Sequence, residues 1–156
     1  MARPLKFRIT AMIVQSVLRS KKNSHVLTIR PDDTVLKFVQ LLRLAGVGAM
    51  IVSKDGHSLD GIISERDVVR ALATDENKLL TLPVSALMTH DTVTCSPSDT
   101  IAHVTHLMTE RRVRHLPVME GDRLVGVISI GDVLKHRVDE VQFEAAVLRD
   151  IAIAGR

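Results

Sequence analysis

Two long stretches of the chain share one pattern of apolar and polar positions. In each, a short extended segment ends at a proline, an Asp-Thr pair follows, and apolar residues then recur at mostly helical spacing. Asp and Thr are typical N-caps, because their side-chain oxygens accept free backbone N–H groups of a helix's first turn. The pattern predicts two helices, one with its apolar face on Val35, Phe38, Val39, Leu42 and Leu44, the other on Ile101, Val104, Leu107 and Met108.

Each predicted helix is followed by two short apolar runs that predict a β-hairpin. The runs are VGAMIVS (47–53) and GIIS (61–64) in the first stretch, and HLPVM (115–119) and GVIS (126–129) in the second. The segments between them carry Gly and Asp, which favour tight turns. A further helix follows each hairpin. Both stretches therefore have the predicted order β-α-β-β-α, which places the chain in the α/β (α+β) class.

The two stretches align as an internal repeat. Pro31 and Thr34 match residues 66 positions later, whereas Gly61, Ser64 and Asp67 match residues 65 positions later, so the second copy lacks one turn residue. VQSVL (14–18) likewise matches VSALM (84–88). Two units this short bury their sheets by packing together, which predicts one module with pseudo-twofold symmetry and two equivalent clefts. The predicted ranges are an N-terminal segment 1–13, repeats 14–74 and 84–137, a linker 75–83 and a C-terminal helix 138–156.

The paired motifs GIISERDVV and GVISIGDVL, with IRPDDTV, CSPSDTI and RRVRHLPV, resemble a tandem pair of cystathionine-β-synthase (CBS) domains, the arrangement called a Bateman module. The resemblance covers most of the chain, from Val14 to Arg137. It implies a regulatory module that binds an adenine nucleotide (AMP, ADP, ATP or NAD(H)) between the repeats. It also implies that two modules pair into a flat homodimer.

The Ser-x-x-Asp motif after each hairpin is the first candidate binding element. A hydroxyl at a helix entrance lies beside unpaired N–H groups and the positive end of the helix dipole, which favour a phosphate. The resemblance implies that Ser64 and Ser129 lie near phosphate and that Asp67 and Asp132 bind the ribose. The alternative is a capping box, in which serine and aspartate only satisfy the helix terminus.

Further site residues follow from the resemblance. It implies that Arg114 and His115, before LPV, face the phosphates; the alternative is a surface arginine and a half-buried histidine at a strand edge. The first copy has glycine and alanine there, so we expect only one cleft to carry the full basic lining, with Arg66 compensating in the other. The adenine slot is expected to be closed by the segments before each first strand, at Thr89, Thr92 and Thr94 in the second copy and at Asn23, Val26 and Thr28 in the first.

Composition narrows the possible partners. The chain has 156 residues and a formal charge of +3, and only 2% of its residues are aromatic, so few rings are available to stack nucleic-acid bases. We interpret the basic clusters at 3–8 and 19–22 as solvated surface. The cluster of Arg111, Arg112 and Arg114 leaves nucleic-acid binding as a low-ranked hypothesis. No apolar run has the length of a membrane span or a signal peptide, which predicts a cytoplasmic protein without a membrane partner.

No catalytic motif emerges, and we predict that the chain is not an enzyme. Cys95 is the only cysteine and is interpreted as a small core thiol. His103, His106 and Glu110 stand at i, i+3 and i+7, which permits a metal site, but a polar outer helix face gives the same pattern, and we predict no metal.

The C-terminal helix has apolar residues at Val138, Val141, Ala145 and Leu148; we expect it to pack on its own module, with a partner as the alternative.

Two functions are weighed beside nucleic-acid binding. The first is a nucleotide sensor that signals to an unidentified regulated protein by changing the packing of its repeats. The second is a constitutive scaffolding dimer that keeps the fold and binds no nucleotide.

Overall fold

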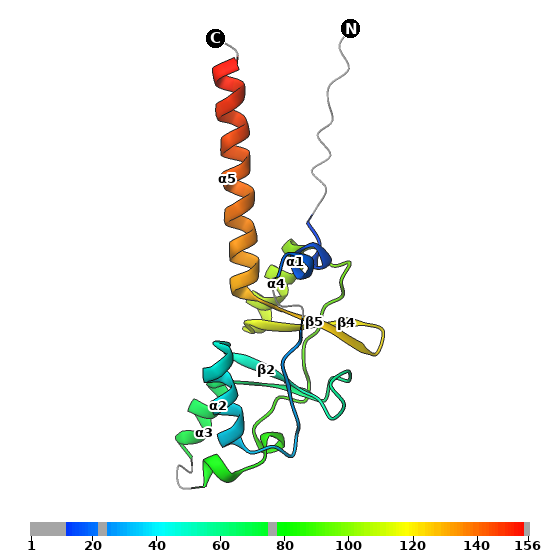
Figure 1. Ribbon diagram of the computed structural model, residues 1–156, viewed down its shortest axis with the longest axis vertical. Coiled ribbons are helices and arrows are strands. Elements are labelled where there is room, and N and C mark those ends of the chain that lie inside the picture. The colour runs from blue at the N-terminus through cyan, green and yellow to red at the C-terminus, as the bar shows by residue number, and fades with distance from the viewer. Residues whose placement is uncertain (1–11, 22–24, 75–77, 155–156) are drawn as a thin grey trace.

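The computed structural model describes residues 12–21, 25–74 and 78–154, and Figure 1 shows two stacked halves with one long helix leaving the second. The first half contains β1 (Thr28–Ile29), α2 (Val35–Ala45), β2 (Ala49–Val52), β3 (Gly61–Ser64) and α3 (Glu65–Leu72). The second contains α4 (Ile101–Arg111), β4 (His115–Glu120), β5 (Arg123–Ser129) and α5 (Ile130–Ala154). The segments before them carry α1 (Val14–Ser20) and the short 3-10 helices η1 (Leu79–Thr81) and η2 (Val84–Ala86). The predicted mixed α and β repeats are confirmed.

The first half is built on a three-stranded sheet. β2 pairs in parallel with β1 and antiparallel with β3, where Met50 lies opposite Ile63. Both residues are buried and pack with Phe38 of α2. The hydroxyl of Thr34 accepts the N–H of Lys37, so the predicted cap is present. Through Phe38, α2 therefore closes one side of this sheet, whereas Val39 and Leu44 of the predicted apolar face are exposed.

The second half has a two-stranded sheet, because β4 and β5 form a hairpin. The strand predicted before them is reduced to one parallel bridge between Cys95 and Val118. Cys95 is buried in the second core, and burial, with a smaller effect of Asp99, raises the pKa of its thiol to about 12. The thiol is therefore protonated near neutral pH, as suits a core residue.

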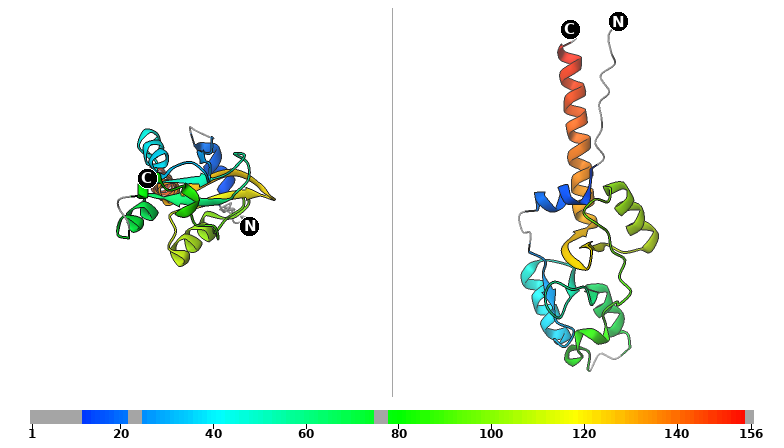
Figure 2. Two further views of the ribbon diagram at one scale, coloured as in Figure 1. Left: turned by 90° about the horizontal axis from the view of Figure 1, so that it is seen from below. Right: turned by 90° about the vertical axis from the view of Figure 1, so that its right-hand side faces the viewer.

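Each half is completed by the segment that precedes the other half in the chain. The N–H of Val14 donates to the carbonyl of Asp99 (2.8 Å), and the N–H of Val84 donates to the carbonyl of Asp33 (2.7 Å). Val14 and Val17 accordingly belong to the second core, whereas Val84 belongs to the first. Figure 2 shows α1 and α4 on opposite sides of the second hairpin. The packing units thus differ from the continuous ranges 14–74 and 84–137.

The crossing segments pass close to two equivalent glycines. A Cβ on Gly61 would lie 2.7 Å from the carbonyl oxygen of Thr89, and one on Gly126 would lie 2.8 Å from the Leu18 side chain. Both glycines are the first residues of the motifs that the two repeats share. Because glycine has no side chain, another segment of the chain can pass directly over the strand at these positions. The obstacle is backbone in the first half and a movable side chain in the second.

The aligned segments VQSVL and VSALM differ in structure, since the first lies in α1 and the second contains the 3-10 helix η2 (Val84–Ala86). The predicted boundary at 137/138 falls inside the continuous helix α5. The expected packing of the C-terminal helix on its own module is wrong, since Val138, Val141 and Leu148 are 52–68% exposed. Among the described residues, no helix has the length and apolar character to cross a membrane.

We predict that Gly61→Ala destabilises the protein more than Gly126→Ala. The methyl group at position 61 meets backbone and costs about 1–3 kcal/mol, whereas Leu18 can turn away from the methyl group at 126. Urea unfolding measures both changes. Gly131→Ala, which only approaches Ser129 Oγ at 3.6 Å within α5, is the control and should be neutral or stabilising. Equal costs at 61 and 126 would contradict this account of the crossings.

Candidate functional site

Two cavities lie between the halves and are related by the internal repeat. The Ser64 cavity has a volume of about 430 Å³, and the Ser129 cavity has a volume of about 800 Å³. Both volumes fall in the range of small-molecule sites. The cavities share four lining residues, which lie in strands β2, β3 and β4 or directly before β2: Gly48, Ala49, Ile62 and His115. Each cavity is therefore lined by residues of both halves.

The Ser64 cavity is built on the turn from β3 into α3. The backbone N–H and the hydroxyl of Ser64 both donate to Asp67 Oδ2, at 2.7 and 2.8 Å. Ser64 and Asp67 form the capping box that the sequence left open, and the two bonds to Oδ2 fix the carboxylate one turn into the helix. Among the ion pairs of residues 12–21, 25–74 and 78–154, none includes Asp67. Its remaining lone pairs are available to a hydroxyl donor in the cavity.

Arginines surround this turn from both halves. Arg66 and Arg70 come from α3, and three more come from the end of α4 and the segment before β4: Arg111, Arg112 and Arg114. Arg66 donates to the carbonyl of Arg112 at 3.5 Å, and Arg114 lies 4.0 Å from Glu65. The other acidic lining residues are Asp67 and Asp91. Positive charge therefore exceeds negative charge in the lining, and guanidinium groups match phosphate oxygens in geometry.

The backbone of Arg112 adopts an unfavourable conformation. It ends α4 with φ 53°, in the left-handed region, where the equivalent residue of the first half is Gly46 with φ 63°. This conformation is unfavourable by about 1 kcal/mol or more for a residue with a Cβ. Strained residues of this kind gather at functional sites, where the surrounding structure holds them.

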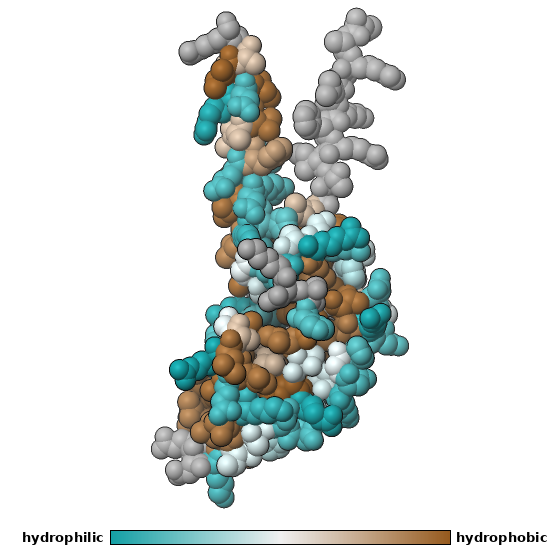
Figure 3. All heavy atoms as spheres, viewed as in Figure 1, coloured by the Kyte–Doolittle hydropathy of each residue, from teal (hydrophilic) through white to brown (hydrophobic). Residues whose placement is uncertain are grey.

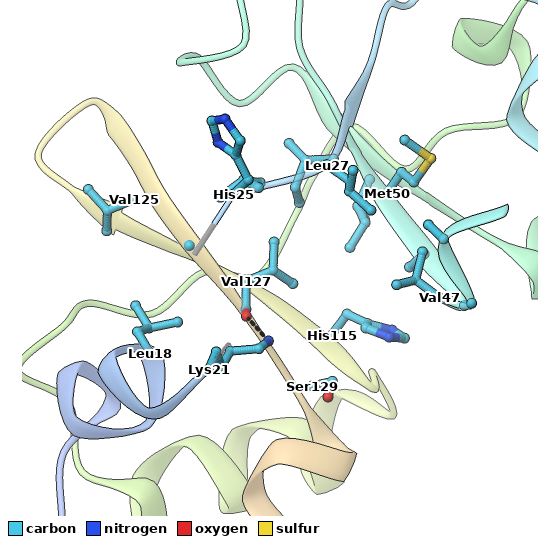
Figure 4. A pocket seen from close by; sticks show the side chains of 18 of the residues that line it. Leu18, Lys21, His25, Leu27, Val47, Met50, His115, Val125, Val127 and Ser129 are labelled. Carbon is cyan, nitrogen blue, oxygen red and sulfur yellow. Dashed lines mark hydrogen bonds between the residues drawn. The ribbon is translucent and has the colours of Figure 1, made fainter. Parts of the chain in front are cut away.

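The Ser129 cavity is built on the same kind of turn, but here the aspartate already binds a lysine of the same chain. Ser129 donates to Asp132 through its N–H (2.8 Å) and its hydroxyl (2.9 Å). The ammonium of Lys21 also donates to Asp132 Oδ2 at 2.8 Å. Figure 4 shows its second bond, to the carbonyl of Val127 at 3.0 Å. Burial opposes ionisation of Asp132, but these donors outweigh it and hold the pKa of the carboxyl below its ordinary value. An internal cation thus already binds this carboxylate.

His115 lies between the two cavities and is half-buried at the start of β4. Burial and the nearby Arg114 lower the pKa of its imidazole, and Glu65 opposes them in part. The ring is therefore neutral at physiological pH and offers one donor and one acceptor nitrogen.

Comparison with known proteins identifies the fold that carries these cavities. The family model of the CBS domain matches residues 17–74 and again residues 84–139. The chain is a tandem CBS-domain protein. The resemblance in the sequence motifs is thereby confirmed.

Known relatives agree with this assignment. The chain is 34% identical over 134 residues to the mitochondrial CBS domain-containing protein CBSX3 of Arabidopsis thaliana, covering 81% of this chain and 65% of that protein. The solved CBS-domain protein ATU1752 of Agrobacterium tumefaciens is 38% identical with a TM-score of 0.77, over 85% of this chain and 98% of that one. The CBS domain pair of protein MJ0100, solved with 5′-methylthioadenosine and S-adenosyl-L-methionine, has a TM-score of 0.73 at 21% identity, over 83% of this chain and 98% of that one.

The structure of this CBS pair brings together most of the residues that the sequence singled out. Seven line the Ser64 cavity: Ser64, Arg66, Asp67, Thr89, Thr92, Arg114 and His115. The Ser129 cavity is lined by Val26, Ser129 and His115, with Asp132 behind Lys21. Thr28 and Thr94 are not among the lining residues of either cavity, and Asn23 lies outside the described residues.

Two expectations about charge need correction. Arg66 does not compensate in a different cavity from Arg114, because both line the Ser64 cavity. Lys21 is not solvated surface, because it binds Asp132. Sequence reasoning missed its role because the two residues are 111 positions apart and meet only when α1 packs on the second half. It also missed Arg70, whose spacing of four from Arg66 places both on one face of α3.

The histidines of α4 do not gather ligands for a metal. His106 Nε2 lies 3.9 Å from Glu110 Oε2 on an exposed face. Within the described part of the chain, no three His, Cys, Asp or Glu side chains come close enough to hold an ion.

We predict that Lys21→Met destabilises the protein by about 1–2 kcal/mol at pH 7, because it leaves Asp132 without its ammonium partner. The folded-state pKa of Asp132 is lowered, so its stabilising contribution is present above the ordinary value of 3.8 and is lost as the pH falls through the folded-state pKa. Urea unfolding of both proteins between pH 7 and pH 3 should show the difference shrinking below pH 4.

Lys37→Met is the matched control. It removes a lysine from Asp33, at 2.6 Å, but on a more exposed helix face, and should cost about 0.5 kcal/mol or less. If Lys21→Met costs no more than this control, or costs the same at every pH, Lys21 does not hold the Asp132 carboxylate.

Proposed function

We propose that this CBS pair is a regulatory module that binds an adenine nucleotide in the Ser64 cavity. The observation that carries the proposal is the position of Ser64 and Asp67 at a helix entrance inside a cavity lined by arginines of both halves. Every ligand of this class carries a phosphate group and a ribose diol on its adenosine part, and the cavity offers a matching partner for each. The ligand class is AMP, ADP, ATP or NAD(H).

The phosphate groups are assigned to the arginine side of the cavity. Arg66, Arg112 and Arg114 lie beside the N-terminus of α3, where backbone N–H groups and the helix dipole also favour an anion. The single pairing of Arg114 with Glu65 is long, at 4.0 Å, and both side chains are more than half exposed. A phosphate can therefore take over this arginine without breaking a buried ion pair.

The ribose is assigned to Asp67 rather than to Asp132. Both carboxylates have the same relation to their serine, but only Asp132 already accepts the ammonium of Lys21. A ribose hydroxyl at Asp132 has to displace a charge-assisted hydrogen bond, and one at Asp67 does not. The Ser64 cavity is therefore the preferred site, with one ligand for each chain.

Regulation follows from the position of the cavity. Ser64, Arg66 and Asp67 belong to the first half, whereas Arg112, Arg114 and His115 belong to the second. A ligand that binds groups of both halves stabilises the packing in which those groups converge, and shifts the equilibrium by its differential affinity for the alternative packings. An unidentified protein that distinguishes these packings receives the signal. The likeness to MJ0100, whose structure holds 5′-methylthioadenosine and S-adenosyl-L-methionine, supports the adenosine part of this proposal, and the arginines of the cavity support the phosphate part.

A scaffolding dimer without a ligand is the second candidate, and one observation favours it. Both Ser-x-x-Asp turns are satisfied as caps, so neither needs a nucleotide to complete its hydrogen bonds. The two candidates differ in one measurable property, which is the response of the native state to nucleotides.

We predict that one or more of AMP, ADP, ATP, NAD and NADH raise the thermal unfolding midpoint of the full chain, first shown to be free of co-purified nucleotide. At a ligand concentration of 100 times Kd the native state gains about 2.7 kcal/mol, a shift of roughly 5–10 °C. Asp67→Asn should abolish most of the shift, because an amide oxygen still accepts the Ser64 N–H but binds a diol weakly.

Asp132→Asn is the matched control and should keep the nucleotide-induced shift. Flat midpoints across the panel would exclude the sensor and favour the scaffold. A shift that disappears in Asp132→Asn and persists in Asp67→Asn would move the site to the Ser129 cavity. Binding of DNA or RNA with a steep salt dependence, in place of nucleotide, would assign the arginines to nucleic acid.

We predict that Arg112→Gly raises stability while lowering nucleotide affinity. Glycine adopts the left-handed conformation at the end of α4 without strain, so unfolding should require about 1 kcal/mol more. Loss of the guanidinium should weaken binding about tenfold in calorimetry. Gly46→Ala, at a site with no heavy atom within 4 Å of the added Cβ, should lower stability by a similar amount and leave affinity unchanged. A more stable variant with unchanged affinity would show that Arg112 does not bind the ligand.

A further inference from the structure

Helix α5 extends far beyond the half that begins it. Its first turns pack on α1, α4 and β5, and Val133 is the one residue of the described helix in the second core. The remaining length projects away from both halves (Figure 1). Space-filling Figure 3 shows apolar side chains recurring along this projection. The exposed part of α5 is therefore a helix with apolar side chains that no described segment of the chain covers.

The apolar residues of α5 form one continuous seam. Positions alternately four and three residues apart, beginning at Leu134, are all apolar, and we call these six the α5 stripe: Leu134, Val138, Val141, Ala145, Leu148 and Ala152. The four larger members are 52–68% exposed. The neighbouring seam that begins at Val133 is interrupted by Arg137, Glu140 and Glu144. A 4-3 spacing of apolar residues is the pattern of a helix that packs along a second helix.

An uncovered helix of this kind is unfavourable in water. The part from Val138 to Ala154 is about 25 Å long, only slightly above the length of about 22 Å below which isolated helices are marginal in water. Packing along an apolar seam supplies the missing stabilisation. The stripe begins at Leu134, which is 59% exposed, so the second half does not obstruct a partner helix at its root.

We propose that the α5 stripe binds the α5 stripe of a second copy in a parallel two-stranded coiled coil. The flanking charges support this partner. With the stripe at positions a and d, Glu144 takes a g position and Arg149 takes the following e position. In a parallel pair, Glu144 faces the partner's Arg149, and the symmetric contact repeats on the other side. Two opposite-charge pairs therefore flank the seam.

The charges also select the parallel orientation. An antiparallel pair that matches all six stripe positions places Glu144 beside Glu144 of the partner subunit and Lys135 beside Arg149 of the partner subunit. Both contacts are repulsive. The parallel pair keeps both modules at the same end of the coiled coil, and it is distinct from the flat module-to-module dimer that the resemblance implied.

Sedimentation of the full chain over a range of concentrations tests the proposal. We expect a monomer–dimer equilibrium that Leu148→Glu weakens at least tenfold, because it places a charge in the seam. Phe143→Glu is the matched control: this residue is 71% exposed, compared with 68% for Leu148, but it lies off the stripe. It should leave the dimer unchanged. A protein that stays monomeric, or an association state that Leu148→Glu leaves unchanged, would overturn the proposal, and so would equal losses in both variants.

Two further variants test the orientation. Leu148→Cys should form an intermolecular disulfide under mild oxidation, since only the parallel pair brings position 148 beside its own copy; the full antiparallel pair separates them by about 15 Å. The native Cys95 is buried and protonated, and does not compete. Glu144→Arg and Arg149→Glu should each weaken self-association, and a mixture of the two should restore it as a heterodimer. Failure of the cross-link in a dimer that depends on Leu148 would exclude the parallel arrangement.

Discussion

The arrangement of both halves depends on the exchange of the segments that precede them. The N–H groups of Val14 and Val84 donate to the carbonyls of Asp99 and Asp33, so each segment caps the half to which it does not belong in sequence. The crossings then run over Gly61 and Gly126, where no side chain obstructs them. Each half takes part of its core from the segment that precedes the other half. The two cavities therefore lie between halves that are joined by two crossing segments, one from each half to the other.

Within this symmetric frame, a few unmatched residues make the cavities unequal. Arg112 and Arg114 stand where the first half has Gly46 and Gly48, and they add charge to the Ser64 cavity. Lys21 satisfies Asp132 in the other cavity. The repeat thus produces two similar cavities, each with a Ser-x-x-Asp turn. Residues outside the shared motifs make them different: arginines favour an anion in the Ser64 cavity, whereas Lys21 already binds the aspartate at the Ser129 cavity.

The sequence predicted the parts of the fold that local physics controls. Caps at Thr34 and Thr100, the hairpins and the buried thiol of Cys95 each depend on residues close together in the chain or on a strong apolar preference. The exchange of segments was not predictable in this way, because Val14 and Val84 have similar apolar surroundings in either half. For the same reason the partner of Lys21 was missed. The placement of Arg66 beside Arg114 required the relative orientation of the halves, which no local pattern contains.

The second Ser-x-x-Asp turn and the projecting rod of α5 are one continuous piece of backbone. Ser129 ends β5 at the wall of a cavity, and Ile130 begins a helix of 25 residues, about 37 Å long. Such a helix behaves as a lever. A tilt of the second half by roughly 5° moves the far end by about 3 Å, half the spacing of successive helical turns. Small changes in how the halves close on each other are thereby enlarged at a point remote from both cavities.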